Sequence, residues 1–318
     1  MPVASVIMPV CNAGNLVKTS LTSALWQTCR DFEVIVVDDA SDDRTAENVH
    51  NLFRKKPTGK LRLIQVSKRI GTCAARNMGA KEASGKYLAF LDQDDSWLPQ
   101  KLEFQANYLD QQPECAMVFG DLEAIDSSGY RLDFTAIPQH CKHAPSWEDI
   151  LMLHPLYPSS SLVRREVFQE LGGFDPSFVM SGAYGDQELH LRMREKWRID
   201  FVDGIVGSYR WDVERPHRIE SFLVNLPTYA RICWDRKEIT PLRSPDLQRR
   251  FVRLCQRQYV YYANLLLASS YARLSDRQLR IIAHPPSEFM RIFPDLYFEL
   301  TGARPVNLPE NVDTPMIR

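Results

Sequence analysis

The first hundred residues alternate short apolar runs with segments in which apolar residues recur at helical spacing. Apolar runs bounded by turn residues indicate buried strands, and recurrence at every third or fourth position indicates helices. Strands are predicted over residues 3–10, 32–37, 61–66 and 87–91. Helices are predicted over residues 16–25 and 45–54, and in a segment that runs to residue 83. This alternation predicts an α/β fold with a mostly parallel, doubly wound sheet.

Two of the predicted strands end in carboxylates, at Asp38 and Asp39 and at Asp92, Asp94 and Asp95. Parallel strands carry their loops to one edge of the sheet, where ligands bind, so we expect the two groups to meet. Like charges this close need compensation, and a Mg²⁺ or Mn²⁺ ion shared with nucleotide phosphates would supply it. The alternative is a solvated acidic turn in which Asp95 or Ser96 caps the next helix, a helix predicted over 97–109.

Composition narrows the function classes. The chain has 318 residues and a net charge of −1, so no overall basic field recruits nucleic acid. No apolar run approaches the roughly 18 residues that span a bilayer, and the start lacks the pattern of a secretory signal. Seven cysteines without a CxxC pair favour a reduced, cytoplasmic protein with buried thiols over a zinc site.

The usual glycine-rich nucleotide motifs are absent. The first predicted strand is followed by Cys11-Asn12-Ala13-Gly14, which supplies neither a Gly-x-Gly-x-x-Gly fingerprint nor a phosphate loop ending in Gly-Lys-Ser/Thr. A nucleotide would therefore be bound by other groups. The groups that this sequence offers are the carboxylates together with a metal ion.

Several ordered motifs resemble those of family 2 glycosyltransferases, which have the GT-A fold. They are Val6-Ile7-Met8-Pro9-Val10-Cys11-Asn12, Gln27-Thr28, Val36-Val37-Asp38-Asp39-Ala40-Ser41, Gly71 with Ala75-Arg76-Asn77, Phe90-Leu91-Asp92-Gln93-Asp94-Asp95, Ser160-Ser161-Leu162-Val163-Arg164-Arg165, Leu171-Gly172-Gly173-Phe174-Asp175 and Gly185-Asp186-Gln187-Glu188-Leu189-His190-Leu191-Arg192. The resemblance covers residues 3–212, about two-thirds of the chain. Ordered motifs are more specific together than any one alone.

The resemblance implies an inverting, metal-dependent glycosyltransferase with a nucleoside-diphosphate sugar donor, for which we expect a uridine nucleotide, and a hydroxyl acceptor on a saccharide or lipid-linked saccharide. The residues implied in donor binding are Pro9 and Val10 in the base pocket, Asp39 as acceptor of a hydrogen bond from the base, Arg76 on the nucleotide, and Asp92 and Gln93 near the ribose. Asp94 is implied as the ligand of Mn²⁺ or Mg²⁺, and Asp186 as the general base. By the same analogy, the product belongs to a surface polysaccharide or glycolipid.

The sequence departs from the family pattern at several positions. Cys11 replaces a tyrosine, Gly185 replaces the glutamate before Asp186, and Arg69 and Ile70 replace an asparagine before Gly71. The histidine often found after a late Tyr-Arg pair is absent, since Trp211 stands there. The second metal or phosphate ligand therefore remains open.

The chemistry of these residues supports some of the implied roles, but each residue also has a purely structural alternative. A carboxylate at a helix start stays ionised and can accept the proton of an attacking hydroxyl, which suits Asp186, although it could simply be the helix N-cap. Arg76 could form a surface ion pair of little energetic value. Trp147, Trp211 and His154 could bind a sugar, but lone aromatic residues more often lie in the core.

The C-terminal third has a different character. Two helices are predicted, over 215–236 and 246–273, and the second carries an apolar stripe with four arginines mainly off it. This helix either lies on a membrane surface or, as we prefer, packs on the catalytic region with its basic face in solvent. We therefore predict a catalytic domain over 1–214, a helical region over 215–300 and a loose tail over 301–318.

Two other function classes stay open. A catalytically silent, glycosyltransferase-like module would bind nucleotide or glycan, but the presence of both Asp94 and Asp186 disfavours it. A nucleotidyltransferase would share the sheet and the acidic site, but the residues after the first strand lack its glycine-rich loop. The predicted location is the cytoplasm, with peripheral association at the inner membrane face as an option.

Overall fold

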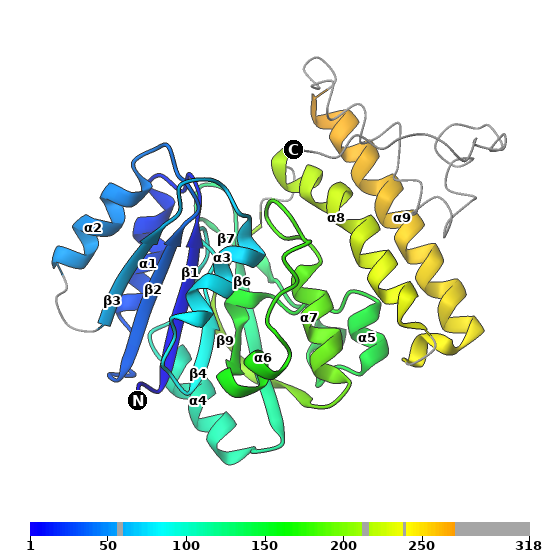
Figure 1. The fold of residues 1–318 in the computed structure, drawn as a ribbon, viewed down its shortest axis with the longest axis horizontal. Coiled ribbons are helices and arrows are strands. Elements are labelled where there is room, and N and C mark those ends of the chain that lie inside the picture. Colours follow the sequence, from blue (N-terminus) through cyan, green and yellow to red (C-terminus); the bar gives the residue numbers. More distant parts are fainter. Residues whose placement is uncertain (56–59, 212–215, 238–239, 271–318) are drawn as a thin grey trace.

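The computed structural model describes residues 1–55, 60–211, 216–237 and 240–270. These residues contain a nine-stranded mixed sheet with the order β3-β2-β1-β4-β8-β6-β9-β5, and β7 pairs with β6 (Figure 1). The strands are β1 (Ala4–Val10), β2 (Phe32–Asp38), β3 (Lys60–Gln65), β4 (Tyr87–Phe90), β5 (Ser96–Trp97), β6 (Cys115–Ile125), β7 (Arg131–Thr135), β8 (Ser161–Arg164) and β9 (Arg198–Arg210). The α/β class is confirmed.

The N-terminal half of the sheet is parallel, as predicted. Strands β3, β2, β1 and β4 run in the same direction, and Ala4 of β1 pairs with Phe32 on one side and Tyr87 on the other. The second half is mixed, because β8 is antiparallel to both β4 and β6, while β9 runs parallel to β6. The carboxyl ends of β1, β2 and β4 therefore lie at one edge.

Helices cover both faces of the parallel half. The α-helices are α1 (Leu16–Leu25), α2 (Thr45–Lys55), α3 (Thr72–Lys81), α4 (Lys101–Gln111), α5 (Trp147–Leu151), α6 (Arg165–Glu170), α7 (Gly185–Arg194), α8 (Pro216–Asp235) and α9 (Pro245–Ser270), and short 3₁₀ turns cover Gln139–Cys141, Pro158–Ser160 and Pro241–Arg243. Because side chains alternate along a strand, Ile7 and Ile35 pack in the core on the α3 side, whereas Val6 and Val34 pack in the core that holds α1 and α4.

The two C-terminal helices pack against each other and share an apolar core with α7. Leu223 and Tyr229 of α8 and Phe251 of α9 belong to the same apolar cluster as Leu189 of α7. In Figure 1, α8 and α9 run side by side next to α5 and α7. The predicted apolar stripe of the second helix therefore faces protein, which confirms the packed interpretation. Residues 271–300 of the predicted helical region, and the predicted tail, lie outside the described residues.

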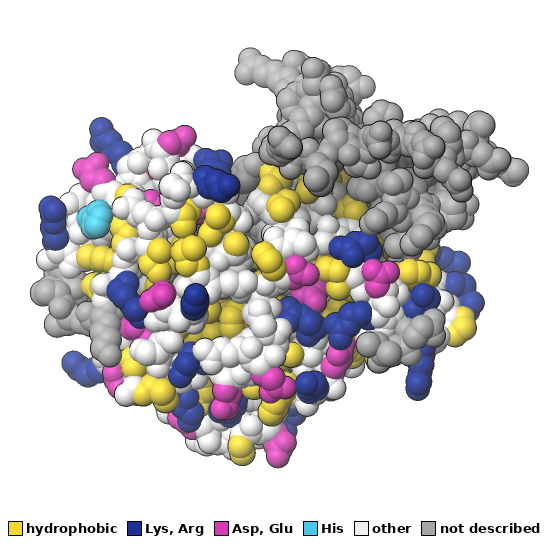
Figure 2. Space-filling view, in the orientation of Figure 1, with side chains coloured by type: hydrophobic (Ala, Val, Ile, Leu, Met, Phe, Trp, Pro, Cys, Tyr) yellow, Lys and Arg dark blue, Asp and Glu magenta, His cyan; other side chains and the backbone are white. Residues whose placement is uncertain are grey.

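The arginines of α9 are exposed, and two of them pair with acidic residues. Arg249 pairs with Asp246, and Arg250 pairs with Glu148 of α5. On the face shown in Figure 2, basic and acidic side chains are interspersed. No helix in the described part of the chain combines the length and hydropathy needed to cross a membrane. Peripheral membrane association stays a prediction.

The helix predicted over 97–109 begins later than expected. Ser96 and Trp97 form strand β5, which pairs with Ser208 and Gly207 of β9, and α4 begins at Lys101. This pairing requires glycine at 207, because a Cβ atom there would lie 2.2 Å from the Ser96 carbonyl oxygen. Pro99 also disfavours helical backbone at the residue before it.

Candidate active site

The carboxyl ends of β1, β2 and β4 meet at the acidic motif, which is the segment Asp92-Gln93-Asp94-Asp95, as the sequence predicted. The Asp39 amide donates to the Val10 carbonyl oxygen (2.8 Å), which joins the ends of β1 and β2. The Cys11 amide donates to Oε1 of Gln93 (2.7 Å), which joins the end of β1 to the loop after β4. Pro9 and Val10 are buried at the end of β1. Their role in a base pocket stays a prediction.

Asp39 fixes the loop that precedes α3. Its two carboxylate oxygens accept hydrogen bonds from the backbone amides of Ile70 (2.7 Å) and Gly71 (2.9 Å). Asp38 accepts a hydrogen bond from the Ser41 amide and so stabilises the turn that follows β2. A carboxylate can accept more than two hydrogen bonds, so contact between Asp39 and a base stays a prediction.

Asp95 is a buried structural residue and caps no helix, so the prediction of an N-cap was wrong. It is 2% exposed and accepts hydrogen bonds from Ser159 Oγ (2.6 Å) and the Arg210 amide (3.0 Å). Burial, together with the charges of Asp94 and Asp92, raises its pKa well above the usual range. The residue before α4 is Gln100, whose side chain makes no capping bond.

Asp92 forms a buried ion pair with Arg76. Arg76 Nη2 lies 2.5 Å from Asp92 Oδ1, and Arg76 is only 3% exposed. The guanidinium also lies over the Phe174 ring, 5.2 Å from its centroid. The alternative of a surface ion pair was therefore wrong. Removing one partner of a buried pair is costly because it leaves the other charge uncompensated.

Asp186 lies in the first turn of α7 and is partly buried. The N-cap of α7 is Tyr184, so the alternative that Asp186 is the cap was wrong. Burial raises its pKa to about 6, against the opposing effects of the Arg76 charge and the Gln187 amide, and Asp92 adds to the rise. Arg76 thus acts electrostatically on both Asp186 and Asp92, and connects the predicted base to the acidic motif.

Arg218 of α8 also lies at the acidic motif, and the sequence analysis did not identify it. Its Nη2 donates to the Tyr209 hydroxyl (2.8 Å) and its Nη1 to the Arg210 carbonyl oxygen (3.4 Å). Burial lowers its pKa, but the charges of Tyr209, Asp94, Asp95 and Asp92 outweigh burial and raise it. No sequence pattern distinguishes Arg218 from the other arginines of the C-terminal helices.

A row of aromatic side chains lies next to Arg218, which donates to the hydroxyl of one of them, Tyr209. Tyr157 packs on Tyr209 (4.4 Å between ring centroids), Tyr209 on Trp211 (6.0 Å) and Trp211 on Phe134 of β7 (5.2 Å). Exposure increases over the last three rings, from 8% at Tyr209 to 36% at Trp211 and 43% at Phe134. Of the three predicted sugar-binding candidates, Trp211 is therefore the one at the site with an exposed ring.

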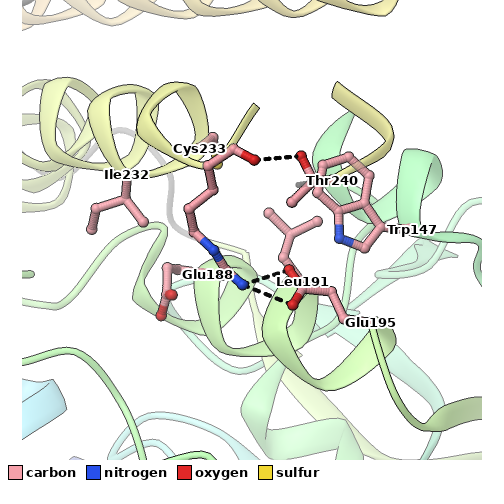
Figure 3. A pocket seen from close by; sticks show the side chains of 8 residues that line it. Trp147, Glu188, Leu191, Glu195, Ile232, Cys233 and Thr240 are labelled. Carbon is pink, nitrogen blue, oxygen red and sulfur yellow. Dashed lines mark hydrogen bonds and ion pairs between the residues drawn. The ribbon is translucent and has the colours of Figure 1, made fainter. Parts of the chain in front are cut away.

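The other two candidates lie in the core. His154 is 5% exposed, and burial lowers its pKa to about 4. Trp147 lines a small pocket with Leu191 of α7 and Ile232 of α8, where Arg236 pairs with Glu195 (Figure 3). Trp147 therefore belongs to the contact between α5, α7 and α8.

The acidic motif fits a cation that a substrate helps to hold. In the described ranges, no group of three or more His, Cys, Asp and Glu side chains is arranged to hold a metal ion. Asp92 binds Arg76 and Asp95 is buried against Ser159, and Asp94 is partly exposed in the turn between them, within reach of a ligand from solvent. Mg²⁺ typically takes one or two protein carboxylates and completes its shell with water and substrate phosphates. One carboxylate with a diphosphate meets that requirement.

Comparison with known proteins shows extensive similarity. Residues 5–172 match the family described as Glycosyl transferase family 2. An uncharacterized glycosyltransferase of Haemophilus influenzae is 36% identical over 132 residues, which are 42% of this chain and 52% of that protein. The UDP-Glc:alpha-D-GlcNAc-diphosphoundecaprenol beta-1,3-glucosyltransferase WfgD of Escherichia coli is 33% identical over 132 residues, which are 42% of this chain and 50% of that protein. The chain thus spans about half the length of these relatives.

Two solved structures have a similar fold. TarS 1-349 of S. aureus in complex with UDP superposes with a TM-score of 0.57 at 17% identity, over 95% of this chain and 92% of that one. The mannosyltransferase PcManGT of Pyrobaculum calidifontis, in complex with GDP-Man and Mn²⁺, superposes with a TM-score of 0.58 at 17% identity, over 94% of this chain and 85% of that one. Both alignments extend over nearly the whole chain and thus include the C-terminal helices.

Proposed function

Because the chain belongs to family 2 of the glycosyltransferases, we propose that it transfers a sugar from a nucleoside-diphosphate sugar to an acceptor hydroxyl, with inversion at the anomeric carbon. The observation that carries this proposal is the pair of acidic sites joined by Arg76. Arg76 pairs with Asp92 of the acidic motif, and its charge also acts on Asp186, which has a pKa of about 6. A base and a diphosphate site are the two parts that the reaction requires.

Asp186 is the proposed general base. A base works best when its pKa is close to the working pH, and a carboxyl raised to about 6 is ionised at neutral pH yet basic enough to remove a hydroxyl proton. One base and one in-line displacement invert the anomeric configuration. The charge of Arg76, which is buried, opposes the rise in the pKa of Asp186 and so favours its ionised form.

The donor site is proposed at the ends of β1, β2 and β4. In this proposal Asp39 accepts from the base, Pro9 and Val10 line its pocket, and Asp92 and Gln93 lie near the ribose. Asp94 would hold the divalent cation, Mn²⁺ or Mg²⁺, whose chemistry is to neutralise the diphosphate as it leaves. A uridine donor is proposed because WfgD is named for UDP-Glc and TarS was solved with UDP, although PcManGT was solved with GDP-Man.

The acceptor is proposed to be a lipid-linked saccharide in surface polysaccharide assembly. The support is the name of WfgD, which specifies a diphosphoundecaprenol-linked acceptor, and that of TuaG of Bacillus subtilis, which specifies teichuronic acid biosynthesis. Such an acceptor lies at the membrane surface, so action in the cytoplasm at the inner membrane face is part of the proposal.

Calorimetric titration with UDP and with GDP, each with and without Mn²⁺, tests the donor site. Wild type, Asp94→Ala and Asp186→Ala are compared. We expect Mn²⁺-dependent UDP binding in wild type and in Asp186→Ala, and its loss in Asp94→Ala. If wild type binds UDP no better with Mn²⁺, the metal assignment is wrong; if it binds GDP instead of UDP, the uridine assignment is wrong. If it binds no nucleotide, a silent module becomes the better interpretation.

A further inference from the structure

Arg218 joins the C-terminal helices to the acidic motif. It is the third residue of α8, and its guanidinium carbon lies 5.4 Å from the centroid of the Tyr209 ring. Nη2 donates to the hydroxyl of that tyrosine, and Nη1 donates to the Arg210 carbonyl oxygen. The guanidinium is therefore held against the end of β9, where the Arg210 amide binds Asp95.

The guanidinium of Arg218 is a positive charge among the carboxylates of the acidic motif. Asp94, Asp95 and Asp92 are all close enough to act on its charge. A guanidinium stays protonated under all working conditions and matches phosphate oxygens with two parallel N–H donors. A guanidinium at this place would lie next to a diphosphate bound at the acidic motif, and could share the phosphate charge with a metal ion held there.

The position of Arg218 depends on contacts between α8 and the segment before α7. Asn225 of α8 accepts from the Val179 amide and donates to the Val179 carbonyl oxygen, both at 2.9 Å. Tyr229 of α8 stacks on Tyr184, the N-cap of the helix that carries Asp186 (5.3 Å between centroids). The same helix is thus fixed to the segment that carries the proposed base and directs Arg218 toward the acidic motif.

We propose that Arg218 contacts the leaving diphosphate of the donor. In the transfer step the acceptor oxygen forms a bond to the anomeric carbon, and its proton goes to Asp186. The bond from that carbon to the β-phosphate oxygen breaks, and the electron pair stays on the phosphate. Arg218 donates hydrogen bonds to the charge that develops there. This assignment rests on the proposed function.

Calorimetric titration of UDP and of UMP, each with Mn²⁺, tests the assignment. The proteins are wild type, Arg218→Ala, Arg218→Lys and a control, Arg231→Ala. Arg231 lies on the same helix, is exposed and pairs with Asp235, so it reports the effect of losing an arginine from α8 away from the acidic motif. Thermal unfolding of each variant shows whether it is folded, and Arg218→Lys retains the charge if the alanine variant unfolds.

The expected result separates the β-phosphate from the rest of the nucleotide. UDP affinity falls about 10- to 100-fold in Arg218→Ala, as expected for a lost hydrogen-bonded charge, and less in Arg218→Lys, which loses the forked geometry. UMP affinity stays within about twofold in both variants, and Arg231→Ala resembles wild type. Equal losses for UDP and UMP, or unchanged UDP affinity, overturn the assignment while the proposed function stands. If wild type binds no nucleoside diphosphate, both fail together.

Discussion

Replacing Asp186 by asparagine is expected to remove activity and to stabilise the protein. The native pKa is about 6, whereas the ordinary value is 3.8. A difference of that size corresponds to about 3 kcal/mol between the two protonation states. Because the carboxylate is only partly buried, solvent screening reduces this figure, and we expect a gain of about 1–3 kcal/mol on neutralisation.

The sign of the effect depends on pH. The folded state holds the Asp186 proton up to about pH 6, whereas the unfolded chain loses it near 3.8. The wild type therefore loses stability between these values as pH rises, and the loss is complete above pH 6. Asp186→Asn should match wild type at pH 3.5, exceed it increasingly up to pH 6, and keep a constant advantage from there to pH 8.

Urea unfolding at several pH values measures the stability difference, and release of nucleoside diphosphate measures turnover. Turnover should fall about 10²- to 10⁴-fold in Asp186→Asn, and the wild-type rate should fall below pH 6 as the base becomes protonated. Asp203→Asn, which changes an exposed carboxylate of β9, serves as the control. If Asp186→Asn is less stable than wild type at pH 7.5, or if the difference in unfolding free energy is the same at all pH values, the raised pKa of Asp186 is contradicted. Turnover within tenfold of wild type would contradict the catalytic role.

Three further changes test other parts of the structure. Glu33 is buried, and although burial alone would raise its pKa, hydrogen bonds from Ser5, Ser84 and Arg62 lower it from 4.5 to about 2. Its charge should therefore contribute about 3 kcal/mol above pH 4.5, lost as pH falls toward 2, and urea unfolding of Glu33→Gln should show a weaker loss of stability across that window. Gly207→Ala places a Cβ atom against the Ser96 carbonyl oxygen and should cost about 1–3 kcal/mol in the same assay, whereas Gly129→Ala, at an open turn with the strain of a positive φ alone, should cost less. Ser159→Ala removes a hydrogen-bond donor from buried Asp95 and should cost about 1–3 kcal/mol at pH 7, while Ser177→Ala, in an exposed turn, should leave stability unchanged.

The parallel half of the fold was predictable because its signals are local. Each buried strand is a short apolar run, and the rule that parallel strands end at one edge places Asp39 beside the acidic motif. The predicted GT-A fold is confirmed by the similarity to TarS, with a TM-score of 0.59. Strand β5 was missed because two residues carry no periodicity, and its existence depends on Gly207, more than a hundred residues away.

The parts of the site that the sequence did not reveal come from long-range contacts. Asp95 looks like its neighbours in the sequence, and only its bonds to Ser159 and Arg210 make it structural. Arg218 belongs to a helix that was predicted, but the direction of its side chain follows from how α8 packs on α7 and β9. Periodicity locates a helix and its apolar face, whereas the neighbour of a polar side chain depends on tertiary packing.

The shared core of α7, α8 and α9 affects how this protein can be recombined with its relatives. If only α8 and α9 were replaced by the helices of a relative, the relative's side chains would pack against Leu189 and Tyr184 of this chain. A chimera joined after β9 would therefore have poorly matched residues in this shared core. A functional crossover point therefore lies before α5, so that α5, α7, α8 and α9 move as one block. The proposed base, Asp186 on α7, and Arg218 on α8 would then be exchanged together.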